Sequence, residues 1–328
     1  MKQRELSVKL KNYANEYIYV LVFIAILIAY LIINGPSTSW TTLTNIFLHS
    51  AISGTIALGM GLIVLTGDID LSVGSIFVFV GGLTILSYNV HGSIVLSILT
   101  AMAIGALCGA FNGFFVGKLG IPSFIVTLAT MLMFRSISQY HMNELGETRY
   151  RIDATKDSYS TLFKIGNGNV LTIPNLAIIF LIITAIFIYI TTSTKFGKSI
   201  YAIGGNERAA KLAGINVTTQ RLIVFTIAGL LVGIASFMKI AKDTSFDPAT
   251  SGQSFELYAI AAVVIGGIQM SGGRGKIAGI VFGTMSFSMI DKIITALSMN
   301  ALLNDFVKGV ILLVAVGLQQ LQGSKNKE

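Results

Sequence analysis

Long apolar runs separated by short polar segments dominate the chain. A transmembrane helix needs about 20 mainly apolar residues to cross the hydrocarbon core of a bilayer, and most of these runs approach that length. We therefore predict ten transmembrane helices, of which the eighth is short, and an even number places both termini on the same side. The predicted spans are residues 17–34, 45–66, 72–89, 94–117, 122–140, 174–193, 221–240, 257–271, 277–296 and 303–321.

The composition supports a membrane protein rather than a soluble one. Hydrophobic residues make up 53% of the chain and charged residues only 12%, whereas soluble domains contain about 25% charged residues. The 34 glycines suit close helix packing, because small residues let two backbones approach inside a bilayer. The single cysteine, Cys108, cannot form an internal disulfide. We predict an all-α integral membrane protein whose first apolar run is an uncleaved span rather than a signal peptide.

The net charge of +8 is explained by lysines and arginines that orient the chain in the membrane. The segments on the N-terminal side carry fourteen lysines and arginines and the opposite segments carry six, so the positive-inside rule places both termini in the cytoplasm. The predicted location is the cell membrane, and this distribution argues against nucleic acid as a partner. The fourteen are Lys2, Arg4, Lys9, Lys11, Lys118, Lys195, Lys198, Arg208, Lys211, Arg221, Arg274, Lys276, Lys325 and Lys327; the six are Arg149, Arg151, Lys156, Lys164, Lys239 and Lys242.

The predicted spans form one multi-span transmembrane domain over residues 17–322. A cytoplasmic segment, 1–16, precedes it and a cytoplasmic tail, 323–328, follows it. Two connections are long: residues 141–173 on the outside and residues 194–220 on the inside. Each could be a solvated connector, which is the default for loops, but these are also the places where partner proteins could bind.

The inner loop contains signals for a short helix. Asn206 is positioned to cap a helix over NERAAKLA, and Gly214 supplies its stop. The preceding Gly204 and Gly205 allow a sharp turn. A helix of about eight residues is not stable alone in water, so it must pack against another surface. A partner protein and the ends of the chain's own spans are equal alternatives for that surface.

The stretch TGDIDLSVGS, residues 66–75, places two aspartates between apolar runs. A charge at the bilayer centre costs about 2.5–3.5 kcal/mol on insertion scales. The second predicted span already crosses the bilayer by Thr66, at about 1.5 Å per residue. We therefore expect Asp68 and Asp70 at the cytoplasmic turn, where a carboxylate and the hydroxyl of Ser72 would cap the next helix.

A short pattern, G-x-I-x-[LM]-S-x-G, occurs twice in the chain. The copies are GDIDLSVG at 67–74 and GGIQMSGG at 266–273. Internal repeats are common in transporters, and we expect a duplication in which both copies have the same sense across the membrane.

Enzymatic and metal-binding motifs are not evident in the sequence. KFGKS at 195–199 resembles the end of a phosphate-binding loop, but Thr192 stands where that motif requires its first glycine. The three histidines lack the spacing of metal ligands, so we expect neither a metal site nor a bound cofactor. Asp305 and Lys308 can pair on one helix face. Such a pair could instead serve an ion-coupled carrier, which is an alternative function.

Four blocks together resemble the permeases of ribose- and monosaccharide-type ABC importers. They are GDIDLSVGS, GIPSFIVTLATM at 120–131, FGKSIYAIGGNERAAKLAGINV at 196–217, and AAVVIGG with SGGRGKIAG at 261–279. The resemblance covers nearly the whole chain in the same order. It implies a pore-forming subunit that is not itself an enzyme and that pairs with a second copy or a paralogue. A cytoplasmic ATPase would use ATP, and an extracytoplasmic binding protein would deliver a pentose or hexose.

The resemblance also implies roles for particular residues. Asp68 departs from the family pattern, which more often has glycine there, so we expect Asp68→Gly to be tolerated and Asp70→Asn to impair assembly or gating. The segment that would contact the ATPase comprises Gly204, Gly205, Asn206, Glu207, Ala209, Ala210, Leu212, Gly214 and Ile215, and the signature turn comprises Gly67, Asp70, Leu71, Ser72 and Gly74.

The remaining candidates are polar residues in the spans and charged residues in the outer loop. We expect a pore with few fixed charges, lined by residues such as Ser53, Thr55, Asn112 and Thr127, although simple helix packing is the alternative explanation for each. Arg149 and Arg151 would contact the binding protein. The same architecture with a nucleoside or a branched-chain amino acid as cargo is a further alternative.

Overall fold

The computed structural model describes residues 18–35, 38–300 and 303–325, most of which are helical. This confirms the all-α prediction. Two antiparallel ribbons join β1 (Tyr150–Arg151) to β4 (Ser245–Phe246) and β2 (Asn169–Val170) to β3 (Ile173–Pro174). The helices are α2 (Ile18–Asn34), α3 (Trp40–Leu65), α4 (Val73–His91), α5 (Ile94–Gly113) continued by the π-helical turn η2 (Phe114–Lys118), α6 (Ser123–Glu144), α7 (Tyr159–Asn167), α8 (Asn175–Ser193), α9 (Lys195–Gly205), α10 (Glu207–Leu212), α11 (Val217–Asp243), α12 (Phe255–Ile265), α13 (Gly279–Ala296) and α14 (Asn304–Lys325).

The helices identify a multi-pass membrane protein. Within the described ranges, six are long and apolar enough to cross a membrane: α3, α4, α5 with η2, α8, α11 and α13. Each predicted span coincides with a helix, but ten complete crossings are not confirmed. The predicted segment 1–16 lies outside the described residues, as do residues 326–328. α14 continues to Lys325, three residues into the predicted tail of 323–328.

The eighth predicted span is a short helix. α12 has 11 residues and rises about 16 Å, roughly half the thickness of the hydrocarbon core. The apolar run continues to residue 271, but Gly267 adopts a φ of +83° and ends the helix. Hydropathy alone does not distinguish a buried turn from a continuing helix, so the span was predicted too long.

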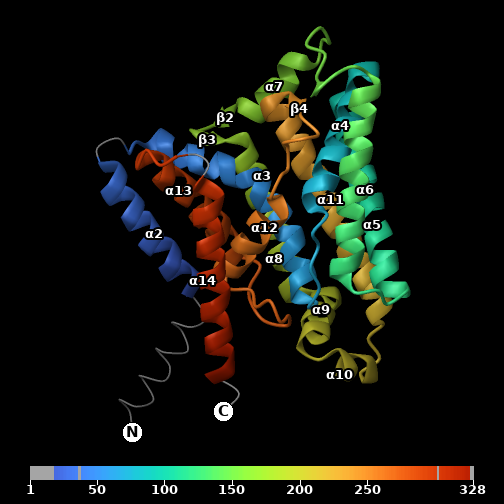
Figure 1. Ribbon diagram of the computed structural model, residues 1–328, viewed down its shortest axis with the longest axis vertical. Coiled ribbons are helices and arrows are strands. Elements are labelled where there is room, and N and C mark those ends of the chain that lie inside the picture. The colour runs from blue at the N-terminus through green and yellow to red at the C-terminus, as the bar shows by residue number, and fades with distance from the viewer. Residues whose placement is uncertain (1–17, 36–37, 301–302, 326–328) are drawn as a thin grey trace.

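The two long loops lie at opposite ends of the molecule. Figure 1 shows α9 and α10 at one end, together with the beginning of α2 and the end of α14, while α7 and β4 lie at the other. α9 and α10 belong to the predicted inner loop, and α7 and β1 to β3 to the predicted outer loop. Following the positive-inside assignment, we call these the cytoplasmic end and the outer end.

Small residues let α5 and α11 pack with their backbones in contact. Gly105 and Gly109 of α5 face Gly229 and Gly233 of α11. A Cβ added to Gly229 would lie 2.8 Å from the Cα of Gly109, and one added to Gly105 would lie 3.0 Å from the Cα of Gly233. Neither position tolerates a side chain, which explains part of the high glycine content.

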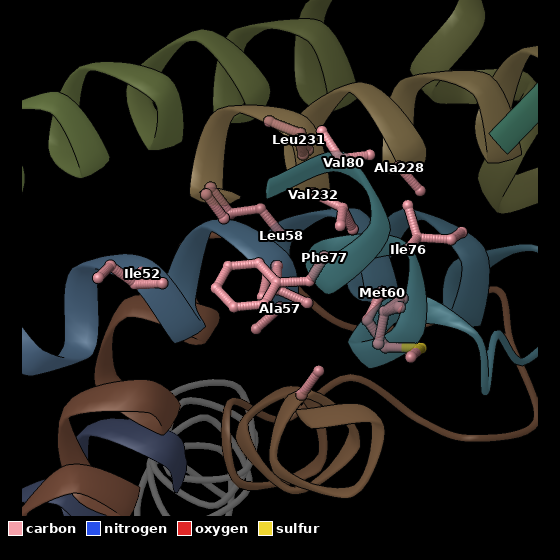
Figure 2. Close-up of a cluster of buried hydrophobic side chains, with 14 of the residues drawn as sticks. Ile52, Ala57, Leu58, Met60, Ile76, Phe77, Val80, Ala228, Leu231 and Val232 are labelled. Carbon is pink, nitrogen blue, oxygen red and sulfur yellow. The ribbon is translucent and has the colours of Figure 1, made fainter. Parts of the chain in front are cut away.

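The hydrophobic core lies between α3, α4 and α11. Figure 2 shows Leu58 of α3, Phe77 and Val80 of α4, and Leu231 of α11 among its side chains, and these residues are fully buried. The ring of Phe77 also lies 5.0 Å from that of Phe255, centroid to centroid, at the start of α12. The start of α12 therefore lies beside the first turns of α4, inside the bundle.

The predicted duplication has a structural counterpart. α3 and α12 end in the same Schellman motif: Gly67 N donates to Val64 O and Asp68 N to Ile63 O, as Gly267 N does to Val264 O and Ile268 N to Val263 O. The φ angles of Gly67 and Gly267 are +85° and +83°. Both helices run toward the cytoplasmic end (Figure 1), so the copies have the same sense, as predicted. Their register differs by one residue from the sequence pattern, because Gly67 corresponds to Gly267 and not to Gly266.

Candidate coupling site and outer cavity

The short predicted helix exists as α10, at the cytoplasmic end. The Asn206 side chain accepts a hydrogen bond from the backbone of Ala209 at 3.0 Å, and Gly214 follows the helix with a φ of +82°, as predicted. Ala210 packs into a small cluster with Ile203 and Val217. Leu212, at the end of α10, is a large apolar residue that is 90% exposed. One side of α10 is therefore anchored on the chain itself, while Leu212 is available to another protein.

Gly204 serves close packing rather than the sharp turn that the sequence predicted. Gly204 and Gly205 are the last residues of α9, and neither has a positive φ. A Cβ added to Gly204 would clash with the carbonyl oxygen of Leu65 and the amide of Gly273, and that amide donates a 3.0 Å hydrogen bond to that oxygen. We call Gly67, Gly204, Gly272 and Gly273 the glycine junction: it joins the end of α9 to the end of α3 and to the loop between α12 and α13.

Arg221 ties α10 to the transmembrane helices. Its Nε donates to Asp68 Oδ2 at 2.8 Å and its Nη2 to Glu207 Oε2 at 2.9 Å. Thr66 Oγ1 also donates to Asp68 Oδ2, at 3.2 Å. Glu207 lies 2.6 Å from the Nζ of Lys211, and that hydrogen bond, aided by Arg221, lowers the pKa of Glu207 below its ordinary value. Asp68, expected to be a dispensable variation, thus has an ion-pair partner.

The signature turn lies deeper in the protein than the sequence suggested. Asp70 is 2% exposed, and its Oδ1 accepts hydrogen bonds from the backbone N (2.7 Å) and the Oγ (2.6 Å) of Ser72. Asn112 Nδ2, within α5, donates to the same Ser72 Oγ at 2.8 Å. The hydroxyl part of the expected cap is wrong, since Ser72 makes no side-chain hydrogen bond to the first turn of α4. The carboxyl group of Asp70 does accept the backbone N–H of Ser72, the residue that precedes α4, and this buried group lies next to Asn112 of α5 through Ser72.

Two further residues of the signature turn serve packing. Gly74 lies against the carbonyl oxygen of Gly252, in the loop before α12, where an added Cβ would clash. Leu71 packs against the core. The signature turn therefore connects α5 and the α12 loop as well as α3 and α4.

A cavity of about 310 Å³ opens in the outer half of the protein. Four helices form it: α3, the end of α11, α12 and α13. Aromatic rings of Phe255, Tyr258 and Phe287 and hydroxyl groups of Ser53, Thr284, Ser288 and Thr295 line it. His49, Lys239, Lys242, Asp243, Asp291 and Lys292 supply its ionisable groups. The lining of this cavity is therefore richer in charge than the predicted pore.

Most of the charges around the cavity are paired. Lys239 forms an ion pair with Asp243, and Lys308 Nζ lies 2.6 Å from Asp291 Oδ1. Lys242 makes a hydrogen bond instead, with its Nζ 3.2 Å from His49 Nδ1. Lys308 therefore pairs with Asp291 and not with Asp305, the partner that the sequence predicted. Lys308 reaches α13 and lies 4.2 Å from the ring centroid of Tyr258, whose hydroxyl donates to Asp305 at 2.7 Å.

Of the four residues predicted to line the pore, Ser53 lies in this cavity. Thr55, Asn112 and Thr127 are completely buried, and each donates a hydrogen bond within the protein. In this conformation these three residues serve helix packing, which was the alternative to pore lining.

The outer loops are held together by contacts that the sequence did not reveal. Arg149 Nε lies 3.6 Å from Asp247 Oδ2, and Arg151 lies opposite Ser245 in the β1–β4 ribbon. Arg135 of α6 donates to the carbonyl oxygens of Pro248 (2.9 Å) and Ser251 (2.7 Å). A contact of Arg149 and Arg151 with a binding protein stays a prediction, and the side chain of Arg149 is 54% exposed.

Known proteins match nearly the whole chain. Residues 42–316 match the family described as the permease component of the branched-chain amino acid transport system. The ribose import permease protein RbsC of Escherichia coli K12 is 33% identical over 297 residues, 89% of this chain and 91% of that protein, and RbsC of Bacillus subtilis is 36% identical over 88% of both. The xylose transport system permease protein XylH of Haemophilus influenzae is 30% identical over 94% of this chain and 97% of its own.

No solved structure matches the chain significantly. The extent of the sequence matches is nevertheless decisive, because they include α10, the glycine junction and the four helices of the cavity. The chain belongs to this family of multi-pass permease components, to which the ribose and xylose permeases of ABC importers are related.

Proposed function

We propose that this chain is the membrane subunit of an ATP-driven importer of a monosaccharide such as a pentose or a hexose. The observation that carries the proposal is α10, which is capped, tied to the transmembrane helices through Arg221, and exposes Leu212 at the cytoplasmic end. A solvated connector needs no such anchoring. The names of the ribose and xylose permeases support a sugar as the cargo.

Each partner has a surface in this proposal. The cytoplasmic ATPase docks on α10 and binds and hydrolyses ATP, while this chain is not an enzyme and binds no cofactor. An extracytoplasmic sugar-binding protein docks at the outer end, where the β1–β4 ribbon joins the two outer loops. A second copy of the chain, or a paralogue, completes the pore, and lipid surrounds the remaining apolar surface.

The glycine junction supports a route from α10 to the pore. α9 leads directly into α10, and its Gly204 contacts the loop between α12 and α13 without an intervening side chain. A displacement of α9 is therefore passed to α12 and α13, two of the four helices that line the outer cavity. Such sliding of packed helices is a common form of conformational change.

A branched-chain amino acid is the second candidate cargo, because the matching family carries that description. An ion-coupled carrier is less well supported. Asp291 and Asp305, the carboxylates that it would use, are engaged by Lys308 and by Tyr258.

Reconstitution tests the proposal. The chain is inserted into proteoliposomes with its ATPase, the binding protein is added outside, and uptake of labelled D-ribose, D-xylose and L-leucine is measured. We expect uptake of a sugar that requires both ATP and the binding protein. Uptake of leucine alone would reassign the cargo, and uptake by the isolated chain along an ion gradient would refute the importer assignment.

A further inference from the structure

We propose that the signature turn is a proton-binding site, in which Asp70 holds a proton and packs against α5 as a neutral acid. The proton is the ligand, and the side chains of Ser72 and Asn112 bind the protonated group. The site is separate from α10 and from the outer cavity, and its chemistry is the same whatever solute the protein moves.

Asp70 has no partner that would balance a negative charge. Its side chain is buried, and no ion pair among the described residues includes it. Asp68, two residues earlier, is paired with Arg221. A carboxyl group that is removed from water without a counter-ion takes up a proton, because the neutral acid loses far less hydration than the carboxylate. The two aspartates of this turn therefore differ: Asp70 is protonated and Asp68 is ionised.

The groups that face Asp70 strengthen this preference. From α12, Glu256 repels an ionised Asp70, and its Oε2 would lie 3.0 Å from a Cβ added to Gly74. From α6, Arg135 acts on Glu256 and donates to two backbone carbonyl groups of the loop before α12. From α5, Cys108 contributes a thiol, which is neutral at ordinary pH. Among the described residues, these neighbours give Asp70 a like charge and no counter-ion.

The hydrogen bonds around Asp70 leave one acceptor unused. Asp70 Oδ1 accepts from the backbone N and the Oγ of Ser72, and Asn112 Nδ2 donates to the same Oγ. The other end of this amide, Asn112 Oδ1, is buried and has no donor among the described residues. A carboxylate supplies no hydrogen, whereas a neutral acid supplies one.

A proton on Asp70 allows the chain of hydrogen bonds to reverse. The acid hydrogen of Asp70 donates to Ser72 Oγ, and the Ser72 hydroxyl then donates to Asn112. A half-turn of the amide exchanges its nitrogen and oxygen, so Asn112 Oδ1 accepts where Nδ2 now donates. The single change in composition is one proton taken up from water. Because an ionised Asp70 would lose the Ser72 hydroxyl in the reversed arrangement, the unused acceptor obtains its donor only when the proton is present.

Infrared spectroscopy of the full chain in lipid nanodiscs provides the test. A protonated carboxylic acid has a carbonyl stretching band that an ionised carboxylate lacks, and labelling with ¹³C-aspartate shifts this band for aspartate but not for glutamate. We expect a label-sensitive acid band at neutral pH in the wild type and in Asp68→Asn, and its loss in Asp70→Asn. Asp68→Asn is the matched control, because Asp68 belongs to the same turn and is ion-paired.

The labelled wild type is informative even if Asp70→Asn does not fold. Absence of a label-sensitive acid band from the wild type would overturn the proposal, and so would a band that is lost in Asp68→Asn but retained in Asp70→Asn. A bound sodium ion is the competing ligand. We expect equal melting temperatures in sodium chloride and in choline chloride at the same ionic strength. A stabilisation by sodium that disappears in Asp70→Asn would replace the proton by a metal ion.

The pH dependence of unfolding provides a second measurement. An aspartate of an unfolded chain loses its proton at about pH 4, so above this pH the folded protein binds one proton more at Asp70, and stability falls as the pH rises. Asp70→Asn cannot titrate. We expect the unfolding equilibrium constant of the wild type, relative to that of Asp70→Asn, to rise about tenfold per pH unit between about pH 5 and pH 7. A ratio that does not change with pH would mean that Asp70 is ionised in the folded protein, against the proposal.

Discussion

Arg221 binds carboxylates from two distant parts of the chain, Asp68 after α3 and Glu207 in α10. A guanidinium group suits this position because it presents several donors in one plane. The sequence interpretation of Asp68 as a dispensable variation missed the contact, since Asp68 and Arg221 are 153 residues apart and no local pattern connects them. The burial of Asp70 was missed for a similar reason, because its partner Ser72 is held by Asn112 of α5.

Removing the carboxylate of Asp68 should weaken the protein and its coupling to ATP. Asp68→Asn leaves Arg221 with one ionic partner, and an unmade charge-assisted hydrogen bond costs about 1–3 kcal/mol. We expect a lower melting temperature in detergent and less ATPase stimulation by the binding protein. Asp157→Asn, at an exposed position of the outer loop, is the control. Full activity of Asp68→Gly, as first expected from the sequence, would show that the ion pair is unnecessary.

The lowered pKa of Glu207 predicts a pH dependence of stability. Because this pKa lies below the ordinary value of 4.5 in the folded protein, the stabilisation is present above that value and is lost as the pH falls through the folded-state pKa. Glu207→Gln removes the titrating group. We expect the difference in melting temperature between wild type and Glu207→Gln to shrink below pH 4.5. A difference that stays constant on acidification would contradict the assigned ion pairs.

At the scale of elements, apolar length predicted the positions of the helices well, and the predicted span 45–66 ends one residue beyond the end of α3. The end of α12 needed the structure, because this helix ends in a glycine turn within apolar sequence that hydropathy does not mark. Gly204 and Gly205 were assigned to a turn because glycine favours turns. Close approach of two backbones also requires glycine, so the sequence does not separate the two explanations. The three-dimensional neighbours of each glycine decide between these explanations.

Gly204 and Gly205 offer a matched pair of substitutions at the end of α9. A Cβ on Gly204 would clash with backbone atoms of Leu65 and Gly273, whereas a Cβ on Gly205 would meet no atom within 4 Å. Alanine favours a helix over glycine by about 0.5–1 kcal/mol, so Gly205→Ala should be neutral or slightly stabilising. Gly204→Ala should lower the melting temperature and reduce ATP-driven uptake. Similar behaviour of the two variants would argue against the glycine junction as a tight contact.

The whole molecule separates its proposed functions between two ends. The cytoplasmic end contains α9 and α10, and the outer end contains the joined outer loops (Figure 1). The glycine junction lies at the end of α9, and the cavity lies between α3, α11, α12 and α13. The sequence predicted this polarity through its lysines and arginines and through the family resemblance. It did not predict the cavity, because the cavity's residues come from four helices whose spacing along the chain shows no common pattern.

This polarity makes a prediction about two exposed leucines at opposite ends. Leu212 of α10 is 90% exposed and Leu171, between β2 and β3, is 91% exposed, so neither contributes much to the fold. If α10 docks on the ATPase, Leu212→Glu places a charge in an apolar contact, and an interface anchor of this kind is worth about 2 kcal/mol or more. We expect Leu212→Glu to reduce co-purification of the ATPase about 30-fold or more by that energy, with an unchanged melting temperature. Leu171→Glu should retain the ATPase, and loss of the ATPase in both variants, or in neither, would contradict docking at α10.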